Sequence, residues 1–240
     1  MRGIAILAFA LAAIAALAAP SLTAFSSMKP GALAGAWREA RIARIKPNEY
    51  SLVSDEGVTV LRVRSEGAAG TVAHPADADP LATPMLSWRW KIDSVVTKAD
   101  MTHKSGDDYA ARVYVFFDVP LDDLSFGQRM RILMARALYG DEVPSGALCY
   151  VWDNRQPVGT MSPNPYTERV RMIVLESGAT RVGQWVTEQR DVGQDYVQAF
   201  ARPAGAPVPR VIGIGAGADT DQTYESVTAW FGDFRLSPRS

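Results

Sequence analysis

Residues 85–92 alternate between apolar and mostly polar side chains at every step. Leu86, Trp88, Trp90 and Ile92 fall on one face, and the residues between them fall on the other. This period of two is typical of a β-strand that buries one face and leaves the other accessible. Strands of this kind bury their apolar faces by stacking sheet on sheet, so the pattern favours a layered β fold.

Residues 109–119 are apolar on both faces, which indicates a central strand covered on both sides. Clusters of proline and glycine separate further strand-like segments, at residues 58–63, 148–152, 170–175, 182–190, 210–216 and 226–236. We therefore predict an all-β fold: a two-sheet antiparallel sandwich or jelly roll, like carbohydrate-binding modules or galactose-binding domains, with one or two short peripheral helices.

Three segments favour helix. Residues 35–46 and 191–200 are compatible with short helices, the second with Asp191 as its N-cap. A helical insertion is expected at about residues 126–140. Its apolar stripe consists of Met130, Leu133, Met134, Ala137 and Leu138. Two interpretations stay open: a connection packed on the sandwich, or an exposed surface that docks on a partner or a membrane.

The first residues have the pattern of a secretory signal peptide. Arg2 precedes an apolar run at residues 4–19, which is shorter than the roughly 20 residues that span a bilayer. Ala16-Leu17-Ala18 and Leu22-Thr23-Ala24 offer two cleavage patterns. We predict a signal peptide at residues 1–24, a single sandwich domain at 25–240, and a periplasmic or secreted location. No later segment is long and apolar enough to span a membrane.

Composition excludes some classes of function. Hydrophobic residues make up 48% of the chain, enough for a full core. The formal net charge is −1, so no basic excess exists to neutralise nucleic-acid phosphates, and nucleic acid is not expected as a partner. Cys149 is the only cysteine and lies in an apolar run, which favours a core thiol and excludes an internal disulfide. Signature motifs of hydrolases, metalloproteases and nucleotide-binding loops are absent.

A dense polar cluster directly precedes the predicted central strand. It contains Lys104, Asp107 and Asp108, and Arg112 follows on a strand face that is otherwise apolar. A buried arginine needs a carboxylate partner, because an unpaired buried charge costs several kcal/mol. These residues form either a structural ion pair that fastens the loop to the sheet, or the floor of a pocket for a polar ligand.

A second cluster follows the glycine-rich segment 212–217. Asp219 and Asp221 offer hard oxygen ligands of the kind that Ca²⁺ prefers, although the glycine and glutamate of an EF-hand loop are missing. The alternative is a solvated turn. Asp233, in the last predicted strand, shares a face with apolar residues and is expected to be partly buried.

Tryptophans are concentrated on the predicted strands: Trp88, Trp90, Trp152, Trp185 and Trp230. Core packing is the commoner reason for such residues, but a tryptophan on an accessible sheet face can stack on a sugar ring. We expect at most one or two of the five to contact a ligand, with Trp152 as the candidate.

Several motifs together resemble the bacterial domain-of-unknown-function family numbered 3047, over residues 37–237. The motifs are Trp88-Arg-Trp90-Lys, Lys104-Ser-Gly-Asp107-Asp108-Tyr-Ala-Ala-Arg112-Val-Tyr-Val, Tyr150-Val-Trp152, Gly183-Gln-Trp185, Arg190-Asp-Val-Gly-Gln-Asp195-Tyr, Asp219-Thr-Asp221-Gln-Thr223 and Gly232-Asp233-Phe. The family pattern has Asn in place of Gln222 and of Asp191, and it lacks the insertion at 126–140. The resemblance implies an exported protein and one cluster formed by Lys104, Asp107, Asp108, Arg112, Asp219, Asp221 and Asp233.

Our leading hypothesis is a non-catalytic periplasmic or cell-envelope domain that binds a glycan or another polar envelope ligand. The expected ligand-binding residues are Lys104, Asp107, Asp108, Arg112, Trp152 and Asp233, with Ca²⁺ at Asp219 and Asp221. One alternative is a hydrolase or lyase that acts on a polysaccharide, with acid and base among the same polar residues. The other is an envelope scaffold that uses the stripe of the 126–140 helix.

Overall fold

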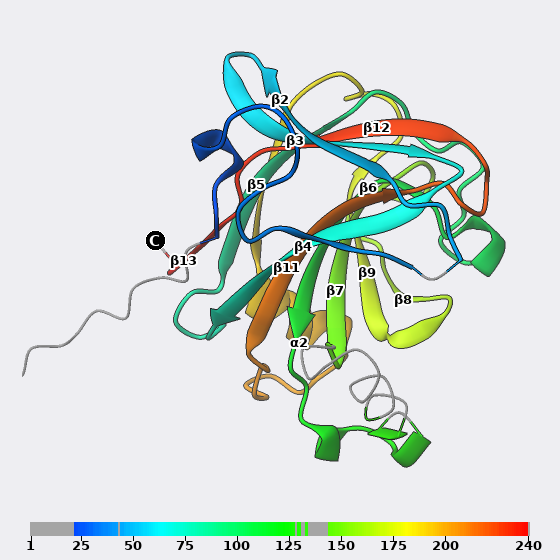
Figure 1. Cartoon of the computed structure of the whole chain (residues 1–240). Coiled ribbons are helices and arrows are strands. Elements are labelled where there is room, and N and C mark those ends of the chain that lie inside the picture. The colour runs from blue at the N-terminus through cyan, green and yellow to red at the C-terminus, as the bar shows by residue number, and fades with distance from the viewer. Residues whose placement is uncertain (1–21, 43, 128, 131–132, 134–143, 240) are drawn as a thin grey trace, which may run out of the picture.

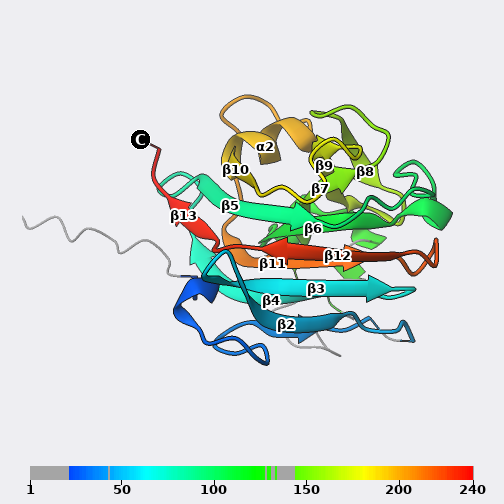
Figure 2. The same cartoon turned by 90° about the horizontal axis from the view of Figure 1, so that it is seen from above.

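The computed structural model describes residues 22–42, 44–127, 129–130, 133 and 144–239. Two β-sheets stack face to face and share one hydrophobic core, as Figures 1 and 2 show. The predicted two-sheet sandwich of jelly-roll type is therefore confirmed. The leader lies outside the described residues, apart from Leu22 to Ala24. Among the described residues, no helix has the length and hydropathy needed to cross a membrane.

The larger sheet has seven strands and the smaller has six. The larger sheet runs in the order β1 (Arg38–Ala40), β4 (Ala69–Ala78), β11 (Val211–Asp219), β6 (Tyr109–Phe117), β7 (Gly146–Asp153), β9 (Thr167–Ser177) and β8 (Met161–Asn164). The smaller sheet runs in the order β10 (Val186–Asp191), β5 (Met85–Ile92), β12 (Ser226–Phe231), β3 (Val58–Glu66) and β2 (Glu49–Asp55), and β13 (Arg235–Ser237) also pairs with β5. Among the described strands, β7 and β9 pair in parallel and the other pairings are antiparallel.

The alternation that predicts β5 describes its burial correctly. Leu86, Trp88, Trp90 and Ile92 are 0–2% exposed, and the residues between them are half-buried. Their side chains meet the inner face of the larger sheet, where the Trp88 ring stacks on Tyr150 at a centroid distance of 5.4 Å. Aromatic contacts of this kind bury large apolar areas and account for much of the energy of the core.

The central position predicted for residues 109–119 is confirmed, but the predicted cover on both faces is wrong for Tyr114 and Phe116, which are half-buried on the outer face. Strand β6 pairs with β11 on one side and β7 on the other. Its inner face joins the main core, and its outer face adjoins a second apolar cluster. That cluster consists of Met101, Tyr109, Cys149, Val151, Met172 and Val174. Met101 belongs to the loop between β5 and β6, so this loop covers part of the outer face.

Helical predictions had mixed outcomes. Helix α2 (Val192–Ala199) is confirmed, and the Asp191 carboxylate caps it by accepting from the Gln194 N–H at 2.9 Å. The helix predicted at 35–46 is wrong, since its central residues form β1, paired with the edge of β4. Pairing with a sheet edge is a tertiary contact that local propensity does not show. Most of the predicted insertion at 126–140 lies outside the described residues.

The first described residues are built into the fold. The Thr23 N–H donates to His74 Nε2 at 3.1 Å, and the Trp37 indole N–H donates to the Thr23 carbonyl at 2.9 Å. The next aromatic residue, Phe25, is fully buried and stacks on Trp37 at 4.6 Å between ring centroids. Residues 23–25 therefore contribute to the core of the domain.

Candidate functional site

The outer face of the larger sheet carries large side chains laid over a stripe of glycines. In the β6–β11 register, Phe116, Tyr114 and Arg112 are opposite Gly213, Gly215 and Gly217. A Cβ at Gly215 would lie 2.7 Å from Thr71 Cγ2 and 3.0 Å from Phe116 Cε2, which is too close. The glycines thus make room for the rings of β6, and this explains the glycine-rich sequence of β11.

Two half-buried aromatic rings lie side by side on this face. The Tyr114 and Phe116 rings are parallel to within 6°, with centroids 5.5 Å apart. Both side chains are partly accessible, in contrast to the inward-facing residues of β6, which are fully buried. Together they form a flat apolar surface in the middle of the larger sheet.

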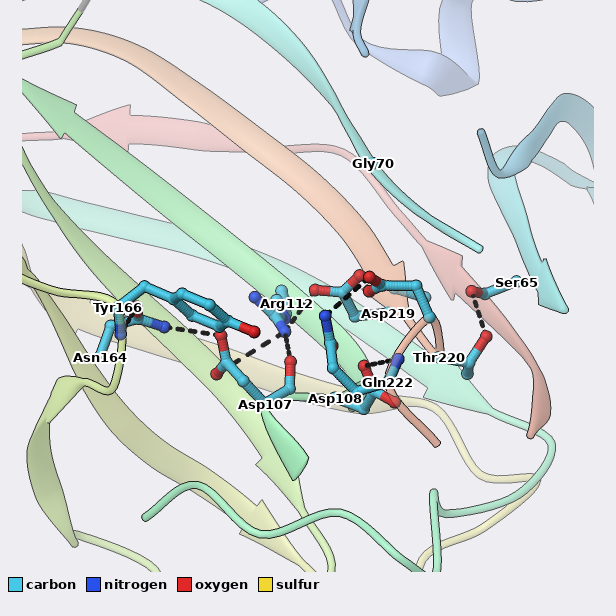
Figure 3. Close-up of polar contacts among 12 residues, drawn as sticks. Ser65, Gly70, Asp107, Asp108, Arg112, Asn164, Tyr166, Asp219, Thr220 and Gln222 are labelled. Atoms are coloured by element: carbon cyan, nitrogen blue, oxygen red, sulfur yellow. Dashed lines mark hydrogen bonds and ion pairs between the residues drawn. The ribbon is translucent and has the colours of Figure 1, made fainter. Parts of the chain in front are cut away.

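Arg112 is the centre of a charged cluster at one end of this surface (Figure 3). Its Nη2 forms an ion pair with Asp219 Oδ2 and donates to the main-chain carbonyl of Asp107. Its Nη1 donates to the Tyr114 hydroxyl at 2.9 Å, and its guanidinium lies 4.5 Å from the Tyr109 ring centroid. Arg112 is only 6% exposed, so these contacts replace water around a buried charge.

The two aspartates before β6 have different partners. Asp107 Oδ1 is 3.9 Å from Arg112 Nη2, and Asp107 Oδ2 accepts from Asn164 Nδ2 at 2.9 Å. Asp108 is fully buried and accepts the main-chain N–H of Thr223 at 2.6 Å and of Gln222 at 3.4 Å. The loop before β6 is thereby fastened to the loop after β11.

Hydrogen bonds to the end of β3 and the segment after it fix the loop after β11. Thr220 is fully buried, its hydroxyl lies 2.8 Å from the Ser65 hydroxyl, and its N–H donates to the Ala68 carbonyl at 2.9 Å. One carboxylate oxygen from each of Asp108, Asp219 and Asp221 lies within 4.8 Å of the other two. Asp219 at the end of β11 and Asp221 in the following loop therefore lie close to Asp108, which comes from a distant part of the sequence.

Negative charge exceeds positive charge in this cluster: four aspartates surround the single guanidinium of Arg112. Burial raises the pKa of Asp219 well above its usual range, against the opposing effect of Arg112, and the neighbouring carboxylates add to the rise. Burial and repulsion from Asp108 also raise the pKa of Asp221. Such a site can accommodate a cation, a proton or a ligand that donates hydrogen bonds.

The β8–β9 turn adds two side chains that the sequence analysis missed. Tyr166 is 55% exposed, and its hydroxyl donates to the Lys104 carbonyl at 3.0 Å. Asn164 contacts Asp107, and its own Oδ1 accepts the Tyr166 N–H at 3.0 Å. The sequence Asn164-Pro165-Tyr166 could have indicated them, because Asn-Pro is typical of a turn and an aromatic ring exposed in a turn does not pack in the core. Lys104 lies beside it, with Nζ 5.3 Å from the Tyr166 ring centroid.

Two residues predicted for the site lie elsewhere. Trp152 is 2% exposed and faces the core, because it pairs with the inward-facing Ala111 of β6. Asp233 is exposed and not partly buried as expected, since the chain leaves β12 after Phe231. Asp233 accepts the Ser26 N–H at 2.9 Å, beyond the C-terminal end of β12. The charged cluster adjoins the N-terminal end of the same strand.

The fold and the cluster define a two-sheet β-sandwich protein with a charged site on the outer face of its larger sheet. The chain belongs to the family of proteins of unknown function DUF3047, whose sequence profile matches residues 35–235. No curated protein matches the sequence significantly.

Three solved structures are similar to this chain at low sequence identity. The xyloglucanase domain of NopAA, a type three effector from Sinorhizobium fredii, in complex with cellobiose, has a TM-score of 0.44 at 10% identity, covering 85% of this chain and 93% of that chain. The catalytic domain of Humicola grisea Cel12A has a TM-score of 0.42 at 9% identity, covering 80% and 87%. The family 30 carbohydrate-binding module of the Clostridium thermocellum cellulase Cel9D-Cel44B has a TM-score of 0.36 at 12% identity, covering 88% and 91%.

Proposed function

We propose that the protein is an exported, non-catalytic domain that binds a glycan of the cell envelope on the outer face of its larger sheet. The aromatic rings and the charged cluster together form the binding surface. The observation that carries the proposal is the exposed ring of Tyr166 beside a group of buried polar side chains, on the same face as the Tyr114–Phe116 pair.

Sugars need this combination of groups. A pyranose ring has an apolar face of C–H groups that stacks on aromatic rings, and a rim of hydroxyls that need hydrogen-bond partners. Ligand sites in general combine apolar lining with a few placed polar groups. Asp107 Oδ1 and Arg112 Nε are buried and have no hydrogen-bond partner among the described residues, so the described protein groups do not fully satisfy the polar end of the surface.

The net charge of the cluster restricts the class of glycan that can bind. Four carboxylates against the two cations Arg112 and Lys104 leave the site acidic, so a neutral or amino-bearing glycan is favoured over an acidic one. Envelope location rests on the leader, whose apolar run and cleavage patterns support export.

The proposal is tested by binding of purified protein to an array of envelope oligosaccharides, followed by titration calorimetry on each hit. We expect Tyr166→Ala and Tyr114→Ala to weaken binding about tenfold or more while the circular dichroism spectrum is unchanged. Trp230→Ala is the matched control, because Trp230 lies on the smaller sheet, half-buried next to Lys91. Loss of binding in the control alone, or no binding to any neutral or amino glycan, would refute the proposed site.

The same ligands separate binding from catalysis. Mass spectrometry of each bound oligosaccharide after prolonged incubation should show the intact ligand. Shortened or unsaturated products that disappear in Asp107→Asn would instead establish a hydrolase or lyase. That result would replace the non-catalytic reading and retain the location of the site.

A further inference from the structure

We infer that Asp108, Asp219 and Asp221 bind one divalent cation, and that the chemistry of the site selects Ca²⁺. The three aspartates belong to the charged cluster that the proposed glycan surface includes, but the test of ion binding is made without any glycan and does not depend on the proposed function. Three steps support the inference: the spacing of the carboxylates, an unsatisfied buried oxygen, and the type of ligand atoms.

The spacing suits a single ion. One carboxylate oxygen from each aspartate lies within 4.8 Å of the other two. Oxygens bound to one Ca²⁺ lie about 2.3–2.6 Å from the ion, so two of them can be up to roughly 5 Å apart. All three carboxylates can therefore reach one ion with small side-chain adjustments.

One oxygen in the group is buried without a donor. Asp219 is 8% exposed, and its Oδ2 is used by Arg112. Its Oδ1 is buried and has no hydrogen-bond partner among the described residues. An unsatisfied buried carboxylate oxygen costs free energy that a cation would recover, so the orphan atom indicates a missing ligand independently of the number of acids.

The Gln222 side chain lies beside the same carboxylates. Its Nε2 donates to Asp221 Oδ2 at 2.7 Å, while its Oε1 is buried and has no partner among the described residues. The three carboxylates offer only hard oxygen donors. The group contains no histidine or cysteine, so the softer donors that Zn²⁺ prefers are missing, whereas Ca²⁺ prefers oxygen.

Fixed partners restrict the geometry of the ligands. Asp108 is fastened by two main-chain N–H groups, and Thr220 between the other two aspartates is fully buried. The ion would therefore join two preformed loops, one before β6 and one after β11. Its expected effect is to stabilise the native state without a large change in conformation.

The test is calorimetric titration of chelator-treated protein with CaCl₂, together with thermal unfolding in 5 mM CaCl₂ and in EGTA. We expect saturable binding of one Ca²⁺ and a Tm about 5 °C or more higher in calcium. MgCl₂ at equal ionic strength should give a smaller shift, because Mg²⁺ requires a tighter octahedral shell.

Asp221→Asn separates ion binding from folding. Asp221 is half-buried and repels Asp108, so its neutralisation should leave Tm in EGTA equal or higher while the shift in calcium disappears. Asp233→Asn, an equal loss of charge outside the cluster, should keep the full calcium shift. No saturable Ca²⁺ binding to wild-type protein, or an equal shift in Asp221→Asn, would overturn the inference. A glycan-binding result would not affect either outcome.

Discussion

Arg112 and Asp219 form a buried ion pair across two neighbouring strands, at the point where the register between them shifts. Gly217 is opposite Arg112, but Asp219, two residues on, is opposite Tyr109 instead of Ala110. The irregularity places one extra residue in β6, as in a β-bulge. Bulges redirect side chains near functional sites, and here the shift accompanies the contact between guanidinium and carboxylate.

Removing Arg112 should strongly destabilise the fold. In Arg112→Met, the buried Asp219 carboxylate loses its cation, and breaking a buried pair in this way typically costs about 3–5 kcal/mol. Urea unfolding followed by circular dichroism measures the loss. Arg210→Met is the control, because its ion pair with Asp77 is exposed and should contribute about 1 kcal/mol or less. Equal losses in the two variants would show that the cluster does not stabilise the protein.

Glu188 should make the protein less stable at alkaline pH. Burial, and then repulsion from Glu176, raises the pKa of Glu188 to about 7 from an ordinary value of 4.5. The native state therefore holds a proton that the unfolded state has released between these values, so stability falls as pH rises from about 4.5 to 7 and then levels off. At pH 8, Glu188→Gln should raise Tm by about 2–4 °C, after allowance for solvent screening.

The comparison of pH 4 with pH 8 provides the control for Glu188. Below pH 4.5 the carboxyl is protonated in both states, so wild type and Glu188→Gln should unfold at nearly the same temperature. Thermal unfolding across this range measures the difference. A constant difference at every pH would mean that the substitution acts through packing and not through ionisation.

Cys149 should be chemically inert in the folded protein. It is fully buried on the outer side of β7, and burial raises the pKa of its thiol to about 12. The thiolate is the reactive species, so a disulfide-exchange reagent at pH 8 should label the native protein only as fast as local or global unfolding exposes Cys149. Labelling in 6 M guanidinium chloride should be immediate and serves as the control. Rapid labelling of native protein would contradict the described burial.

Cleavage of the leader should leave Thr23 in the mature protein. Thr23 bonds with His74 and with Trp37, so cleavage after Ala24 would remove contacts that the fold uses. We therefore expect cleavage after Ala18, and not at the boundary after residue 24 that the sequence analysis expects. N-terminal sequencing of protein from the periplasm or medium measures it. A recombinant chain that starts at Phe25 should unfold at a lower temperature than one that starts at Ala19. A mature N-terminus at Phe25 would refute this prediction.

Local patterns in the sequence determined much of the architecture. A period of two depends only on neighbours along the chain, so β5 and its buried face could be predicted from side-chain type. The apolar residues on both faces of β6 predicted its central position in the same way. The N-cap of α2 is equally local, because Asp191 contacts a main-chain group three residues away. Edge strands such as β1 were missed, since their conformation depends on a pairing partner far along the chain.

The sequence itself also marked the acidic and basic residues of the cluster, because a charge on an apolar strand requires a partner. Only the tertiary structure decided which residues meet. The strand register places Trp152 in the core. Asp233 follows the end of β12 and contacts Ser26, away from the cluster. The β8–β9 turn places Tyr166 beside Lys104. Registers and strand ends are set by packing of the whole chain, so no local pattern contains them.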